Sequence, residues 1–380
     1  TAGKFLPAAM GSLNADALKL TGSFSDLVGD RITDPFIKNW LDLLCFLLSG
    51  LDASGTVAAE VAFMFNEWYQ PNCQLDFPVG GSQGMVDALV GGLQKYGGKI
   101  RLGAHVEEIV VEDGVAKGVR VRYRSGERGL VRAREAVVSN ASAWDTEGLL
   151  PRHLKGGERA PEGDPSSSWQ KERADFAKCP SFMHLHAGID ASKLPGLGKE
   201  TEMHHIYVED WSKGITAPQN CVLVSIPSVI DPSLAPEGKH VIHAYTPGNE
   251  PYEVWRGLSR SSKEYKALKE ERSRVLWKAV GLALQVDNPQ DLVDVQMVGT
   301  PLTHERFLRR KFGTYGPALR ADTGQTLPGV KTSIENLLCT GDSTFPGIGL
   351  PAVAASGMLA ANSLTTVSNH LELLDKLYAR

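Results

Sequence analysis

The residues best suited to chemistry in this 380-residue chain lie in the segment 341–357. An apolar run leads to Gly341 and Asp342, and two more glycines follow six and eight positions after Gly341. In open α/β sheets, ligands bind where strands end, and glycines let a backbone approach a ligand closely. Pro351 suits the first turn of a helix, and the short side chains of residues 352–357 leave room for something bulky. The pattern indicates a ligand site, although a Gly/Pro loop that merely packs tightly fits the same spacing.

The predicted helix at the end of this segment adds an electrostatic preference. Its first N–H groups and its dipole favour negative charge. An aspartate aimed at a diphosphate would repel it, so we expect Asp342 to accept hydrogen bonds from hydroxyl groups of the ligand instead.

Histidines invite a metal hypothesis. His184 and His186 are two apart on a predicted strand and therefore share a face, whereas His240 and His243 are three apart and face opposite ways. No carboxylate accompanies either pair at ligand spacing. We therefore expect polar or core histidines and no metal site.

Two further arrangements of residues could form catalytic groups. His304 and Glu305 could serve as acid and base, but a structural ion-pair cluster with the neighbouring arginines is the safer interpretation. A Ser–His–Asp hydrolase is disfavoured because the sequence has no G-x-S-x-G motif.

Composition narrows the class of protein. Hydrophobic residues make up 42% of the chain and the net charge is −4, without a basic face, so nucleic acid is a poor partner. The five cysteines are scattered and form no C-x-x-C pair, which is typical of reduced thiols. No apolar run approaches the roughly 18–20 residues that span a bilayer, and peripheral membrane contact stays open.

Hydrophobic periodicity predicts the elements that position these residues. Helices are expected at 16–51, 57–69, 85–96 and 262–286 and from 351. Short β-runs are expected at 100–102, 106–111, 115–123, 136–139 and 337–340, with Asp113-Gly114 as a hairpin turn. Four more, at 182–189, 204–208, 221–229 and 240–245, suit one mostly antiparallel sheet. Residues 156–175 read as a flexible surface loop.

The fold class predicted from this order is α/β. Residues 78–145 and 326–380 are expected to form one domain. A substrate domain of α+β type is expected to comprise a helical part at 1–77 and an antiparallel sheet with helices at 146–325, which is inserted between the two segments of the first domain.

The segment 341–357 resembles the C-terminal FAD signature of the amine-oxidase-like flavoproteins, in particular that of the FAD-dependent phytoene-desaturase and carotenoid-isomerase family. The residues that carry the resemblance are Gly341-Asp342, Pro346-Gly347, Gly349 and 354–357. The match continues through 77–84, 137–141 and 299–317 and covers nearly the whole chain.

The resemblance implies FAD as cofactor, with Asp342 bonded to ribityl hydroxyls. It places twelve residues in cofactor contact: Val106, Asn140, Ala141, Gly341, Asp342, Pro346, Gly347, Gly349, Leu350, Pro351, Ala352 and Val353. Of these, Val106 would lie beside the adenine, although an ordinary buried strand residue fits Val106 as well. Gly80-Gly81 would pass near the flavin, or simply cap a helix.

The family's G-x-G-x-x-G dinucleotide motif is absent from these 380 residues. That motif forms the pyrophosphate cradle. We therefore expect an N-terminally truncated chain whose FAD-binding domain lacks its N-terminal Rossmann unit.

The function implied is cis–trans isomerisation of a long apolar carotenoid-like polyene, or a related FAD-dependent oxidation, in a plastid. Two alternatives stay open: a non-catalytic carotenoid- or lipid-binding descendant, and an FAD oxidase or saturase of another apolar substrate. The sequence assigns no catalytic residue, double-bond position or oligomeric state.

Overall fold

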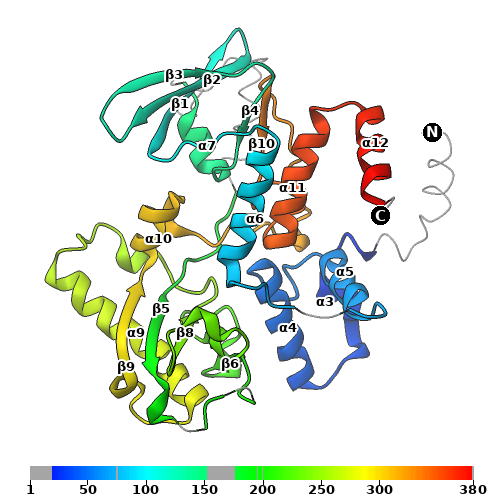
Figure 1. Ribbon diagram of the computed structural model, residues 1–380. Coiled ribbons are helices and arrows are strands. Elements are labelled where there is room, and N and C mark those ends of the chain that lie inside the picture. The colour runs from blue at the N-terminus through cyan, green and yellow to red at the C-terminus, as the bar shows by residue number, and fades with distance from the viewer. Residues whose placement is uncertain (1–18, 74–75, 152–175, 195, 199, 379–380) are drawn as a thin grey trace.

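The computed structural model describes residues 19–73, 76–151, 176–194, 196–198 and 200–378 (Figure 1). The predicted surface loop at 156–175 and the first residues of the predicted 16–51 helices lie outside the described residues.

Three helices open the described chain: α3 (Phe24–Val28), α4 (Pro35–Ser49) and α5 (Ala58–Trp68). The Asp34 carboxylate caps α4 by accepting hydrogen bonds from the N–H groups of Phe36 and Ile37, and Gly50 ends it in the left-handed conformation. The three helices share a small core that includes Phe24, Cys45 and Val61. The helices expected at 16–51 and 57–69 are thus confirmed for the described residues.

A three-stranded antiparallel sheet follows helix α6 (Gly81–Lys95). Its strands are β1 (Ala104–Glu112), β2 (Val115–Tyr123) and β3 (Arg128–Arg132). The expected Asp113-Gly114 turn joins β1 to β2, with both residues at positive φ.

Strands β4 (Val137–Ser139) and β10 (Leu337–Cys339) pair in parallel although 200 positions separate them, with Val137 opposite Leu337. Helix α7 (Ala143–Leu149) follows β4, while α11 (Leu350–Ser363) and α12 (Val367–Tyr378) follow β10. The β1–β2 hairpin packs on this pair through a core that includes Ile109, Ala116, Leu337 and Cys339.

The largest sheet has five strands in the order β6-β7-β8-β5-β9, all antiparallel. Their bounds are β5 (His184–Asp190), β6 (His204–Val208), β7 (Cys221–Ser225), β8 (Lys239–Tyr245) and β9 (Val293–Gly299). Helix α9 (Lys263–Leu284) covers one face, as Figure 1 shows. Leu276 and Val280 of α9 pack there against side chains such as Leu185 and Val224. The expected antiparallel sheet and long helix are confirmed. A short helix, α10 (Pro301–Leu308), follows β9.

Some boundaries were predicted wrongly. Residues 100–102 form no strand: Leu102 lies in a turn with Gly103, whose φ is +68°, and β1 begins only at Ala104. The run expected at 221–229 ends at Ser225, because Pro227, which lacks an N–H, opens a 3-10 turn. Helix α6 starts at Gly81 rather than residue 85. Strands β3 and β9 were not predicted.

Candidate functional site

The segment that is expected to bind a ligand begins at Gly341, two residues after the end of strand β10. The N–H of Thr340 donates to the carbonyl of Ser139 at 2.9 Å, and the N–H of Gly341 donates to Oγ of Ser356 at 2.8 Å. The same Oγ donates to the carbonyl of Val353 at 2.6 Å. The first bond joins the end of β10 to β4, and the second ties it to α11.

Asp342, next along the chain, is paired with Arg310. Nη2 of Arg310 donates to Oδ2 of Asp342 and, at 2.7 Å, to the carbonyl of Tyr315. The side chains are 25% (Arg310) and 17% (Asp342) exposed. The sequence places Arg310 only among the arginines that follow His304 and Glu305, and no local spacing reveals its partnership with Asp342.

The two glycines after Asp342 shape the approach to α11. Gly347 has φ of +133° and Gly349 has φ of +104°, a region that L side chains rarely adopt. Space is open where a Cβ of Gly349 would stand, and Leu350 is exposed. Because no side chain caps α11 at Gly349, the first N–H groups of this helix are left for another partner.

The remaining predicted contacts divide into two groups. Asn140 directly follows β4, and its Oδ1 faces Gly341, so Asn140, Ala141 and Gly341 come together at one end of the parallel pair. Val106 lies in β1, opposite Val121. The structure does not bring Val106 into a described contact with the segment.

Two other predicted features have plain local roles. Gly80, in the left-handed conformation, is the N-cap residue of α6, and its N–H donates to Oδ2 of Asp231 at 3.0 Å. Glu305 accepts a 2.8 Å hydrogen bond from the Tyr252 hydroxyl. Of the neighbouring arginines, Arg310 pairs with Asp342 instead, and among the described residues no ion-pair cluster forms around Glu305.

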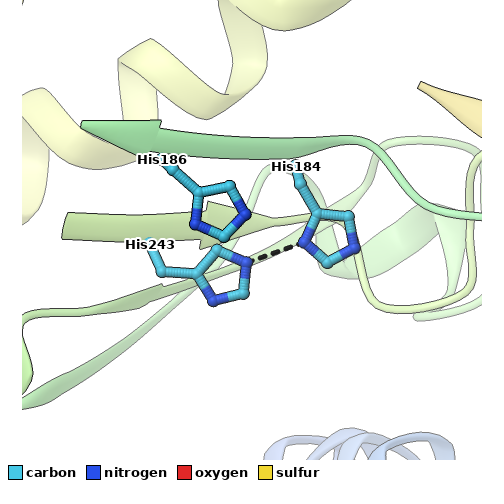
Figure 2. A group of neighbouring side chains, drawn as sticks. All are labelled: His184, His186 and His243. Carbon is cyan, nitrogen blue, oxygen red and sulfur yellow. Dashed lines mark hydrogen bonds between the residues drawn. The ribbon is translucent and has the colours of Figure 1, made fainter. Parts of the chain in front are cut away.

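A group of histidines lies on the sheet face opposite α9 (Figure 2). His186 of β5 and His243 of β8 are directly opposite each other in the strand register, and His184 shares their face. Nδ1 of His184 and Nε2 of His243 are 2.7 Å apart. One ligand nitrogen from each of the three lies within 4.8 Å of the others.

Sequence reasoning saw the first two histidines share a face but did not bring His243 to them. The opposite orientations of His240 and His243 are confirmed: Nδ1 of His240 lies 2.8 Å from Oγ of Ser228, away from this group. Only the β5–β8 register places His243 beside His186.

Burial sets the charge of this group. Burial, together with the smaller effects of the neighbouring His304 and His243, lowers the pKa of His184 to about 2. Burial also lowers the pKa of His243 and of His304 to about 4. These imidazoles are therefore neutral at pH 7, with lone pairs available.

Comparison with known proteins finds carotenoid enzymes. The chain is 35% identical over 333 residues to the chloroplastic prolycopene isomerase of Arabidopsis thaliana, covering 87% of this chain and 52% of that protein. Identity is 34% over 349 residues with the chloroplastic prolycopene isomerase of Daucus carota, covering 91% and 53%. It is 27% over 305 residues with the neurosporene-forming phytoene desaturase of Rhodobacter capsulatus, covering 76% and 53%. The chain thus spans about half the length of the curated relatives it matches.

Solved structures share the fold. A crystal structure of an oxidoreductase from Methanosarcina mazei matches with a TM-score of 0.55 at 18% identity, covering 90% of this chain and 68% of that one. A protein from Pyrococcus furiosus matches with a TM-score of 0.53 at 17% identity, covering 90% and 67%. No protein-family model matches the chain.

Proposed function

This chain belongs to the family of carotenoid isomerases and phytoene desaturases, and we propose that it serves FAD-dependent cis–trans isomerisation of a long apolar polyene, or a closely related oxidation. The observation that carries the proposal is 35% identity over 333 residues to a prolycopene isomerase. The strand-to-helix geometry at Gly341 supports it, because it matches the place where open α/β sheets bind ligands.

The residues present fit a flavin cofactor. Gly347 and Gly349 permit close backbone approach, and the uncapped start of α11 offers N–H groups to a negatively charged ligand edge. FAD, when bound, supplies hydride acceptance or, in its reduced form, electron density that lowers the barrier to double-bond rotation. The residues of this chain would bind the cofactor and orient it towards the substrate.

Specific roles follow for the predicted contacts. We assign the N-terminal turn of α11 to the flavin end, Asn140 and Ala141 to the nucleotide edge, and Val106 to the adenine. Asp342 would meet ribityl hydroxyls, held in position by Arg310, which donates to its Oδ2. The complete set of cofactor contacts we propose is Val106, Asn140, Ala141, Gly341, Asp342, Pro346, Gly347, Gly349, Leu350, Pro351, Ala352 and Val353.

The proposed domain division follows the same geometry. Residues 78–145 and 326–380 would form the FAD-binding domain, since β4 and β10 pair across 200 positions. Residues 1–77 and 146–325 would form the substrate domain. Parallel strands normally lie in larger sheets with both faces covered. The β4–β10 pair therefore supports an FAD-binding domain that gains further strands from a dinucleotide unit carrying the G-x-G-x-x-G motif.

An apolar substrate fits the first helices. Phe36 and Trp40 of α4 and Phe63 and Trp68 of α5 are exposed aromatic side chains. Such a surface suits a polyene without polar groups and peripheral contact with a membrane that holds it. No helix in the described part of the chain is long and apolar enough to span a bilayer. We propose a plastid location, as for the chloroplastic relatives.

The test is a flavin and product analysis, with and without reductant, of the purified full-length protein that includes the proposed dinucleotide unit. We expect FAD to be released on denaturation, and a cis-carotene to become all-trans, with unchanged mass, only after reduction. Absence of flavin overturns the cofactor assignment. A product that has gained or lost hydrogen identifies an oxidase or saturase, and carotenoid binding without flavin or turnover identifies a non-catalytic descendant.

A further inference from the structure

His184, His186 and His243 form a cluster that the proposed flavin chemistry does not use. We propose that these three histidines bind one divalent transition-metal ion of the zinc class, each through one imidazole nitrogen. The proposal rests on their geometry and stands independently of the flavin site.

The distances between the ligand nitrogens lie on either side of the distance expected at a zinc site. Two nitrogens bound to a tetrahedral zinc lie about 3.4 Å apart, given zinc–nitrogen bonds of about 2.0–2.1 Å. Nδ1 of His184 and Nε2 of His243 are 2.7 Å apart, and the three ligand nitrogens all lie within 4.8 Å of one another. Displacements of about an ångström, within reach of imidazole rotation, therefore reach metal geometry.

The strand register makes this arrangement rigid. His184 and His186 project from β5 two residues apart, and His243 projects from the adjacent β8 opposite His186. In Figure 2 the three rings turn towards one another from these neighbouring strands. The ring planes lie within 4° of parallel, so the rings must tilt for their in-plane lone pairs to converge on one tetrahedral ion. A site on strands is more precise than one on loops.

The ligand set indicates the metal class and leaves one position open. Imidazoles suit zinc, copper, iron and nickel, whereas calcium and magnesium prefer oxygen ligands. Three histidines are a ligand set of catalytic zinc sites, where water or substrate takes the fourth position. His304, whose ring centroid lies 4.5 Å from that of His184, stands beside this group and can order such a water.

The surrounding charge does not oppose a cation strongly. Neutral imidazoles present lone pairs rather than positive charge. Arg310 acts on His304, but its charge is countered by the ion pair with Asp342.

Metal binding requires a change of tautomer. The 2.7 Å contact holds one proton between Nδ1 of His184 and Nε2 of His243. On metal binding that proton moves to the other nitrogen of the same ring, so each residue donates one lone pair and no net proton is released from neutral imidazoles.

The experiment measures zinc and cobalt binding to the chain, which is purified with an affinity tag that contains no histidine. Wild type should hold about one zinc per chain after dialysis, and Co²⁺ should give the intense visible absorption of a four-coordinate site. His186→Ala is the test variant, because His186 is exposed and its removal leaves the core intact. It should weaken zinc binding by about 100-fold or more, since even residues that only orient a ligand contribute about 10–100-fold.

His204→Ala is the matched control. His204 lies on the same sheet, with Nδ1 2.9 Å from Oγ of Ser225, and outside the three-histidine group. Its variant should bind zinc like wild type. Equal binding by wild type and His186→Ala, or equal loss in both variants, overturns the proposal and leaves a hydrogen-bonded imidazole network. If His186→Ala unfolds without metal, His243→Gln serves as the second test variant, with the same expected loss.

Discussion

Gly341 and Asn140 approach so closely that a Cβ built on Gly341 would lie 2.6 Å from Oδ1 of Asn140. The contact arises because β10 and β4 run in parallel and each ends at this point. Gly341 also has a φ of +98°, which an L side chain rarely adopts. Two residues that are 201 positions apart thus require the absence of a side chain at position 341.

Gly341→Ala should therefore destabilise the fold by about 2–3 kcal/mol, combining backbone strain with the clash against Asn140. Denaturant unfolding of the purified variant measures this. The double variant Gly341→Ala/Asn140→Ala should relieve the clash but not the backbone strain. It should therefore regain only part of the lost free energy of unfolding.

Gly357→Ala is the control for this substitution. Gly357 lies inside α11 with open space around its Cβ position. Alanine there should be neutral or stabilise the helix by about 0.5–1 kcal/mol. Equal losses at positions 341 and 357 would contradict the account.

Much of this arrangement was predictable, and the missing parts have a common cause. The strand before Gly341 and the helix after it follow from local periodicity and from Pro351. The partner of Asp342 does not, because Arg310 reaches it from a loop 32 positions earlier. The histidine cluster likewise depends on register: a one-residue slip of β8 against β5 would turn His243 to the α9 face.

Breaking the Arg310–Asp342 pair should also destabilise the protein. Asp342→Ala leaves a half-buried guanidinium that loses a charged acceptor, so we expect a loss of about 1–3 kcal/mol in urea unfolding. Glu108→Ala is the matched control, since the Arg120–Glu108 pair is 59% and 39% exposed and should contribute under about 1 kcal/mol. A loss no larger than that of the control would show that the buried pair is dispensable.

Another ion pair, between Glu250 and Arg272, lies near the five-stranded sheet. The Glu250 side chain is fully buried and accepts hydrogen bonds from Nε1 of Trp255 at 2.8 Å and from Nη2 of Arg272 at 2.9 Å. Glu250→Ala should lower the free energy of unfolding by about 3–5 kcal/mol, because Arg272 keeps a charge without its partner.

The double variant Glu250→Leu/Arg272→Met separates two explanations of that loss. It should be more stable than Glu250→Ala, since replacing both charges with apolar groups removes the unpaired charge. A double variant as unstable as the single one would place the effect in packing around Trp255 instead.

The pH dependence of stability should report on Glu60 in α5. Burial raises the pKa of Glu60 from 4.5 to about 7. Below pH 4.5 the carboxyl is protonated in both folded and unfolded chains and has no effect. Between pH 4.5 and 7 the unfolded chain loses its proton first, so Glu60 progressively destabilises the fold, and the full penalty is present above pH 7. Glu60→Gln should therefore raise the free energy of unfolding by roughly 2–3 kcal/mol at pH 8 and by almost nothing at pH 4.

Glu67→Gln, at an exposed position of the same helix, is the control and should show no such difference between the two pH values. A gain from Glu60→Gln that is the same at pH 4 and pH 8 would mean that the glutamine acts through packing rather than through charge.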